Sequence, residues 1–124
     1  MAYIPYAIYR KIQRKRMNKF VIEFYEKENG SVPVEEFLLG LNIEMRAKLT
    51  GLVQILLEKG NMLREPYSKH LDEGIFELRG KVGSDISRVL YFFYYDGKII
   101  LTNGFVKKTM KTPKVEIERA KAYR

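Results

Sequence analysis

The chain has 124 residues, with 23 lysines and arginines against 15 aspartates and glutamates, one histidine and no cysteine, so its formal net charge is +8. A chain of this length corresponds to one small domain, and a hydrophobic content of 46% is enough to form a core. The lack of cysteine excludes disulfide bonds, thiol nucleophiles and cysteine zinc sites, and a single histidine excludes sites that need two imidazoles. We therefore expect neither a metal nor a cofactor.

The sequence also lacks the signals of membrane insertion and secretion. No uninterrupted apolar run reaches the length of about 18 residues that a membrane span requires, and no apolar segment follows a basic N-terminus in the manner of a signal peptide. We therefore expect a cytoplasmic protein without a membrane partner.

Positive charge is concentrated at the two ends of the chain. Residues 1–16 contain five basic residues and no acid, residues 17–73 contain 7 basic and 10 acidic residues, and residues 74–124 contain 11 basic and 5 acidic residues. A basic C-terminal half on a mildly acidic body is typical of a protein that binds a polyanion such as nucleic acid. The alternative is a solvated basic surface without a partner.

The first half of the chain predicts one strand followed by two helices. Residues 1–16 are either a separate basic arm or an extension that precedes an internal start at Met17. Residues 19–25 alternate in the manner of a strand. Ser31 is expected to cap a short helix that ends before Gly40, and Asn42 is expected to cap a second helix whose apolar residues recur every three or four positions up to Gly60.

The second half predicts a meander of three strands and a last helix. Residues 61–73 are interpreted as a connecting loop, and strands are expected at residues 75–82, 85–95 and 98–107, joined by two-residue turns at 83–84 and 96–97. Thr112 is expected to cap the last helix, with Pro113 in its first turn. The order β-α-α-β-β-β-α predicts a small α+β domain, an antiparallel sheet with helices packed on one face.

The two hairpins fix which residues lie opposite one another. If both turns contain two residues, Arg79 faces Arg88 and Arg88 faces Phe105 on the neighbouring strand. Because side chains alternate between the faces of a sheet, one face is expected to carry the polar set Glu77, Arg79, Arg88, Asn103, Phe105 and Lys107. The other is expected to pack against the helices through Phe76, Leu78, Val89, Tyr91, Phe93 and Ile100.

The polar face has the chemistry of a phosphate site. Two arginines that face each other repel unless an anion lies between them, and Glu77 offsets only part of the charge of Arg79, Arg88 and Lys107. Phe105 adds a flat surface on which an unpaired base could stack. The alternative is that Glu77 and the arginines form a surface ion-pair network and that Phe105 closes the edge of the core.

The same residues carry a resemblance to a known family. Residues 71–79 (L-x-x-G-I-F-E-L-R), 88–93 (R-V-L-Y-F-F), 104–113 (G-F-x-K-K-T-x-K-T-P) and 116–120 (E-I-x-x-A) occur in this order. The sequence is similar to the phage-derived Gp49-like proteins, the HigB branch of the RelE-like toxins of type II toxin–antitoxin systems. The resemblance covers residues 17–124, which we expect to form a RelE/HigB-like toxin domain, while residues 1–16 have no counterpart.

The resemblance implies an activity and partners. It implies an endoribonuclease that cleaves messenger RNA on the ribosome and inhibits translation, and a cognate antitoxin, commonly a helix-turn-helix protein, through which alone the toxin contacts operator DNA. The family's basic and aromatic positions fall on Arg79, Arg88, Phe105, Lys107 and Lys108. Of these, Arg79, Arg88 and Lys107 are the expected catalytic residues, and Phe105 and Lys108, together with Lys111, are expected to bind RNA.

A metal-free mechanism suits these residues. The 2′-OH of RNA can attack the adjacent phosphorus while arginines stabilise the added negative charge. Arginine does not deprotonate, so a lysine whose pKa falls among like charges, Lys107 or Lys108, is the expected general base or acid. Glu77 is either a structural partner of the arginines or a second possible base, and we interpret the single histidine, His70, as a surface residue.

Two other functions remain open from the sequence. A nucleic-acid-binding module without catalytic activity would use the same basic face only to hold a backbone, and its affinity would fall steeply with salt. A degenerate relative would bind the antitoxin and leave growth unaffected. Neither would cut messages, so cleavage of mRNA separates both from the toxin.

Overall fold

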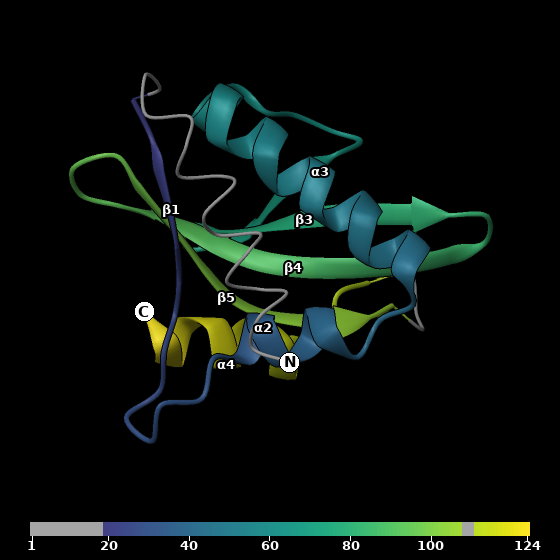
Figure 1. Ribbon diagram of the computed structural model, residues 1–124. Coiled ribbons are helices and arrows are strands. Elements are labelled where there is room, and N and C mark those ends of the chain that lie inside the picture. Colours follow the sequence, from purple (N-terminus) through teal and green to yellow (C-terminus); the bar gives the residue numbers. More distant parts are fainter. Residues whose placement is uncertain (1–18, 108–110) are drawn as a thin grey trace.

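The computed structural model describes residues 19–107 and 111–124 (Figure 1). The predicted boundary between residues 1–16 and 17–124 lies outside these residues. The elements in chain order are β1 (Val21–Phe24), α2 (Pro33–Leu39), α3 (Ile43–Lys59), the 3₁₀ turn η1 (Gly60–Met62), β2 (Ser68–Asp72), β3 (Ile75–Val82), β4 (Asp85–Tyr94), β5 (Lys98–Val106) and α4 (Lys114–Tyr123). The predicted α+β class is confirmed.

The strands form one mixed sheet in the order β1-β5-β4-β3-β2. Strands β2 to β5 pair antiparallel as a meander, whereas β1 pairs parallel to β5, with Val21 opposite Lys98. The prediction of a wholly antiparallel sheet was therefore wrong in its first strand. Side-chain alternation identifies a strand but carries no information about its direction, which depends here on a partner that lies far along the chain.

The segment predicted as a loop over residues 61–73 contains β2. Among the described strands, β2 pairs with β3 alone, and its ladder is irregular between His70 and Asp72. Its sequence, Ser-Lys-His-Leu-Asp, is polar and mostly exposed. A short polar edge strand lacks the apolar alternation that identifies a strand in a sequence, so β2 was not predicted.

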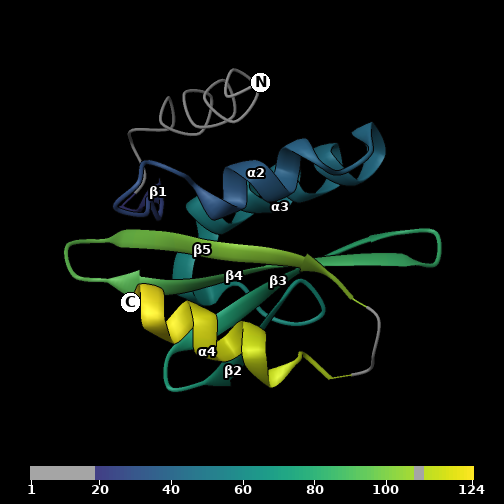
Figure 2. The same ribbon diagram turned by 90° about the horizontal axis from the view of Figure 1, so that it is seen from below.

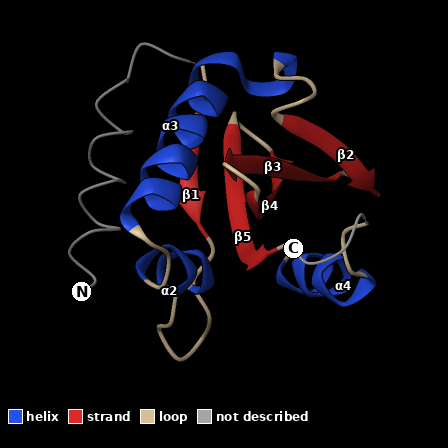
Figure 3. Ribbon diagram, turned by 90° about the vertical axis from the view of Figure 1, so that its right-hand side faces the viewer, coloured by secondary structure: helices blue, strands red, loops and turns tan. Residues whose placement is uncertain are grey.

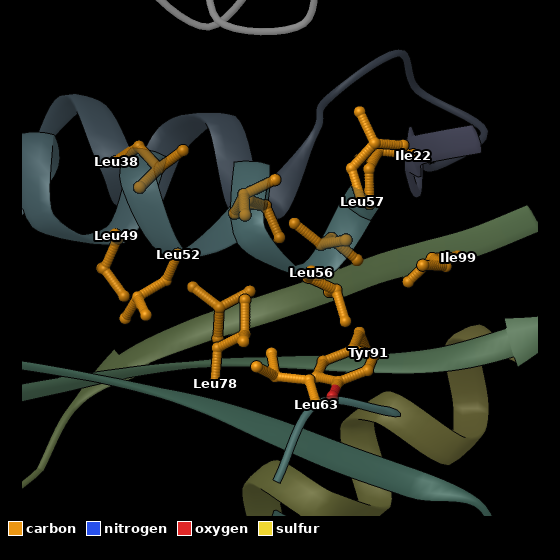
Figure 4. Close-up of a cluster of buried hydrophobic side chains, with 14 of the residues drawn as sticks. Ile22, Leu38, Leu49, Leu52, Leu56, Leu57, Leu63, Leu78, Tyr91 and Ile99 are labelled. Carbon is orange, nitrogen blue, oxygen red and sulfur yellow. The ribbon is translucent and has the colours of Figure 1, made fainter. Parts of the chain in front are cut away.

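The main core lies between the sheet and the pair α2 and α3. Helix α3 buries Leu49, Leu52, Leu56 and other apolar residues against Leu78 of β3 and Tyr91 of β4 (Figure 4). These are the helix stripe and the sheet face that the sequence predicts, so this part of the prediction is confirmed.

Helix α4 packs on the opposite face of the sheet, so the prediction that helices cover one face was wrong. Figures 2 and 3 show α2 and α3 on one side of the strands and α4 on the other. Ala120 of α4 contacts a second apolar cluster that includes Ile75, Leu90 and Phe92. The unbroken apolar run at residues 89–93 is the relevant signal in the sequence, because a strand that is apolar without alternation is covered on both faces, as residues 89–92 of β4 are.

The register of the hairpin between β4 and β5 differs from the prediction near its loop. Tyr94 pairs with Lys98, so the loop has three residues rather than the predicted two, and a bulge between Leu90 and Tyr91 then restores the predicted pairing closer to the site. Between the loop and the bulge every side chain of β5 is shifted to the other face. Ile100 therefore packs with the second cluster and not, as predicted, with the main core.

The helix ends agree with the prediction except at the starts of α2 and α4, and Pro113 rather than Thr112 is the N-cap of α4. The side chain of Asn42 accepts a hydrogen bond from the backbone N–H of Met45 at 2.9 Å, and Gly60 ends α3 with a φ of 53°. Val32 rather than Ser31 is the N-cap of α2, without a side-chain hydrogen bond. The proline that follows Val32 has no N–H, so this helix start has one donor fewer to satisfy.

Arg46 joins α3 to the end of α2. Its Nε donates to the carbonyl of Leu38 at 2.9 Å, and one Nη donates to the carbonyls of Leu39 and Leu41 at 3.2 and 2.8 Å. The last carbonyls of a helix have no partner within the helix. A cation at that position satisfies them and interacts favourably with the helix dipole.

Replacing Arg46 by methionine is expected to lower the free energy of unfolding by about 2 kcal/mol, since three charge-assisted hydrogen bonds are lost. The measurement is urea denaturation followed by circular dichroism. Arg119→Met is the matched control, because Arg119 makes an exposed ion pair with Glu116 one turn earlier in α4 and should change stability by less than about 0.5 kcal/mol. Equal effects of the two substitutions would contradict this role of Arg46.

Candidate functional site

The two central arginines meet on the sheet face that carries α4. Arg79 lies opposite Arg88, and Arg88 lies opposite Phe105, so the predicted pairing is confirmed. Directly opposite residues of an antiparallel pair share a face, and Glu77 lies on the same face two residues before Arg79. The sheet therefore places one carboxylate and two guanidinium groups together.

Glu77 is the anion that separates the two arginines. Its side chain is 0% exposed, and it accepts hydrogen bonds from Arg79 Nε at 2.9 Å, Arg88 Nη1 at 2.5 Å and Thr112 Oγ1 at 2.5 Å. Burial by itself raises the pKa of Glu77, but the hydrogen bonds from Thr112, Arg88 and Arg79 outweigh burial and hold the pKa below its ordinary value. This geometry favours a structural partner over a base.

The two arginines differ in their access to solvent. The side chain of Arg88 is 4% exposed, and its Nη1 donates both to Glu77 and to Thr112 Oγ1, the latter at 2.9 Å. Its Nε is buried and has no hydrogen-bond partner among the described residues. The side chain of Arg79 is 26% exposed. Glu77 and Thr112 thus fix the guanidinium of Arg88, while the more exposed side chain of Arg79 is accessible to a ligand.

A cleft of about 280 Å³ opens over the arginines. It is lined by Lys48, Pro66, Tyr67, Arg79, Lys81, Ile86, Arg88 and Lys107. Five of these eight residues are cations, and none of the described lining residues is acidic. Low-dielectric walls with charges of one sign concentrate the positive potential, so the cleft suits a polyanion and in particular a phosphate group.

Lys107 follows the last residue of β5, where its backbone N–H donates to the carbonyl of Ile86 at 2.9 Å. Desolvation and the neighbouring charges of Arg88 and Arg79 lower the pKa of Lys107. This shift agrees in direction with the expectation for a lysine among like charges, and it makes the ammonium a better proton donor than an isolated lysine.

The other predicted RNA-binding residues lie outside the cleft lining. Phe105 is only 9% exposed and packs in the second apolar cluster with Ala120 of α4, a position that favours closing the core over stacking on a base. Lys111 is exposed and is not among the lining residues. Lys108 lies outside the described residues.

Three polar residues of the cleft were not predicted from the sequence. Lys81 could have been found, because it lies on the same strand face two residues after Arg79 and pairs with Ile86 in the predicted register. Lys48 comes from α3 and Tyr67 from the segment before β2. Their proximity depends on tertiary packing, and no spacing in the sequence encodes it.

His70 lies in β2 on the exposed edge of the sheet. Its Nε2 accepts a hydrogen bond from the backbone N–H of Gly74 at 3.0 Å, and its ring contacts Phe76 edge-on. It does not line the cleft. The structure thus assigns the imidazole to the turn between β2 and β3.

Within residues 19–107 and 111–124, no group of three or more histidine, aspartate or glutamate side chains could hold a metal ion. None of the helices in this part of the chain is long and apolar enough to cross a membrane.

The model of the phage-derived Gp49-like protein family matches residues 36–124. The chain belongs to this family. The match includes α3, the meander and α4, and therefore all the residues that line the cleft. Gp49-like proteins are associated with the toxins of toxin–antitoxin systems. Comparison with curated proteins found no match.

Proposed function

We propose that this Gp49-like protein is a toxin of the HigB and RelE type, an endoribonuclease that cleaves messenger RNA on the ribosome and so inhibits translation. The observation that carries the proposal is the cleft, whose described lining contains five cations and no acid around a space of about 280 Å³. Arg79 and Arg88 share a buried carboxylate beneath it. This arrangement fits a phosphodiester that gains negative charge during reaction.

The proposed reaction is a transesterification that needs no metal. The 2′-oxygen of one nucleotide forms a bond to the adjacent phosphorus, the bond from phosphorus to the 5′-oxygen breaks, and the products carry a 2′,3′-cyclic phosphate and a 5′-hydroxyl. The leaving 5′-oxygen gains a proton, and the 2′-OH loses one. The described residues of the cleft include no carboxylate or imidazole. We therefore propose that water or a ribosomal group accepts the proton of the 2′-OH.

We assign a separate role in this reaction to each of the cationic residues of the cleft. Arg79 and Arg88 hold the phosphate and stabilise the charge of the transition state, because arginine stays protonated and presents paired donors. Lys107, whose pKa is lowered mainly by desolvation and by these two arginines, donates the proton to the 5′-oxygen. Lys48 and Lys81 are placed to bind neighbouring phosphates.

The proposed partners follow from the same assignment. A cognate antitoxin, a helix-turn-helix protein, blocks the toxin and connects it to operator DNA. The ribosome with its bound message is the substrate, which places the activity in the cytoplasm. The association of the family with toxins of toxin–antitoxin systems is the reason for proposing an antitoxin.

The proposal is tested with purified protein in a reconstituted translation reaction that contains one defined message. We expect cuts within the translated region that require ribosomes and that leave 5′-hydroxyl ends. Arg79→Ala should abolish cutting, and Arg119→Ala, which removes an exposed arginine outside the cleft, should not.

Other results of this experiment would contradict the proposal. Equal cutting of the message without ribosomes would overturn the ribosome dependence. Intact messages, combined with salt-sensitive binding of RNA by the folded protein, would indicate a nucleic-acid-binding module. Intact messages without RNA binding would indicate a subunit that binds only the antitoxin.

A further inference from the structure

We infer that Thr112 is a positioning residue for Arg88, an inference that rests on the proposed function of the cleft. Thr112 lies between β5 and α4 and was expected to cap the last helix. Instead Pro113 is the N-cap of α4, and the N-cap makes no side-chain hydrogen bond. The hydroxyl of Thr112 points to the floor of the cleft, where it contacts Glu77 and Arg88.

The three side chains form a closed ring of hydrogen bonds. Thr112 Oγ1 donates to one oxygen of Glu77 at 2.5 Å and accepts from Arg88 Nη1 at 2.9 Å, while the same Nη1 donates to the other oxygen of Glu77 at 2.5 Å. A hydroxyl has one hydrogen to donate and can accept at the same time. Thr112 therefore has the chemistry to fix both the carboxylate and the guanidinium.

The ring determines which edge of Arg88 is left for a ligand. Both hydrogens of Nη1 are directed to Glu77 and Thr112, and Nε is buried without a partner among the described residues. Because Nε is closed to solvent, a ligand in the cleft that Arg88 lines is expected to meet the guanidinium at its second Nη. A hydrogen bond from this Nη to a phosphate oxygen is charge-assisted.

The position of α4 does not depend on this hydroxyl. Ala120 is buried in the second cluster, Tyr123 stacks on Tyr25 with 4.4 Å between ring centres, and Lys121 pairs with Asp72 at 2.8 Å. These contacts hold the helix from its middle to its end. Loss of the hydroxyl alone should therefore leave α4 in place and release only the guanidinium of Arg88.

The test compares Thr112→Val, which keeps the shape without the hydroxyl, with Thr112→Ser, which keeps the hydroxyl. In single-turnover cleavage of ribosome-bound message, Thr112→Val should reduce the rate constant by about 10- to 100-fold, the size expected for a displaced catalytic group, with little change in the protein concentration at half-saturation. Thr112→Ser should stay within about threefold of the unchanged protein. Thr50→Val is the matched control, because the Thr50 hydroxyl donates to a backbone carbonyl within α3.

A second measurement does not require activity. Thr112 is a hydrogen-bond donor that lowers the pKa of Glu77, so NMR titration of the carboxyl carbon should show a higher Glu77 pKa in Thr112→Val and an unchanged value in Thr112→Ser and Thr50→Val. Thermal unfolding checks that each variant is folded.

The outcomes separate this inference from the proposed function. If the unchanged protein cuts messages and Thr112→Val cuts equally well, the inference is wrong and the proposed function stands. If the unchanged protein does not cut, the proposed function fails, and the titration alone decides whether Thr112 fixes the carboxylate. Equal loss of activity in the serine and valine variants would also overturn the inference, since the hydroxyl would then not be the group that matters.

Discussion

Replacing Glu77 by glutamine is expected to lower the free energy of unfolding by about 3–5 kcal/mol, because the buried guanidinium of Arg88 loses its counter-charge. Glu77 and Arg88 are both buried, and their closest N and O atoms lie 2.5 Å apart. Water cannot replace the missing carboxylate at this depth, so the charge of Arg88 stays uncompensated. Urea denaturation followed by circular dichroism measures the loss.

A double variant tests whether the cost comes from the unpaired charge. Glu77→Gln combined with Arg88→Met should be clearly less destabilised than the two single losses added together, since neither charge then remains buried alone. Glu23→Gln is the control, because Glu23 pairs with Lys98 at 3.5 Å where both side chains are 40% exposed, and it should cost less than about 1 kcal/mol. Additive losses at Glu77 and Arg88 would show that the pair is not coupled.

The expected loss of stability affects the interpretation of activity measurements on Arg88 variants. A variant of Arg88 that has lost activity has also lost the partner of a buried carboxylate, so its inactivity does not by itself assign Arg88 to the reaction. Arg79, with a side chain that is 26% exposed, and Lys107 are better tests of the chemistry.

Lys107→Met is expected to reduce cleavage of ribosome-bound message by about 10²- to 10⁴-fold, the usual contribution of a positioned proton donor, without a measurable change in stability. Methionine keeps the apolar stem and removes the ammonium. Lys98→Met is the matched control, because Lys98 lies at the other end of β5 and does not line the cleft. Equal activity of the two variants would remove Lys107 from the mechanism.

The pH dependence identifies the direction in which the proton moves. Desolvation, Arg88 and Arg79 lower the pKa of Lys107 from its ordinary value of 10.5. A donor must be protonated, so the rate constant should fall as the pH rises through this lowered pKa. The charge of Lys69, which does not line the cleft, also lowers this pKa, so Lys69→Met should move the midpoint to higher pH. A rate constant that rises over the same range would identify Lys107 as a base.

Turn length and side-chain alternation were sufficient to predict that Arg79, Arg88 and Glu77 lie together. The turn at Gly83 and Ser84 is short enough to fix the pairing of Arg79 with Arg88, and period two then places Glu77 beside them. The same reasoning extends to Lys81. Asn42 and Gly60 identify the ends of α3, because capping depends only on residues within one turn of the helix end.

The features that differ from the sequence prediction depend on tertiary packing. The three-residue loop at 95–97 moved Ile100 to the other face, and the bulge between Leu90 and Tyr91 restores the predicted pairing beyond it. No turn residue marks the position of the bulge. Helix α4 covers the face that was expected to stay open, which buries Phe105. Lys48 and Tyr67 reach the cleft from elements that the hairpin register does not include.

The most direct test of the catalytic cleft is to map the 5′ ends of cellular messenger RNA after brief expression of the unchanged protein and of Arg79→Ala, with Arg119→Ala as the control. We predict new 5′-hydroxyl ends within coding regions for the unchanged protein and for Arg119→Ala, and none for Arg79→Ala, with all three proteins folded. Folded, unchanged protein that produces no new ends, or ends that persist in Arg79→Ala, would contradict the assignment of this cleft as an RNA-cleaving site.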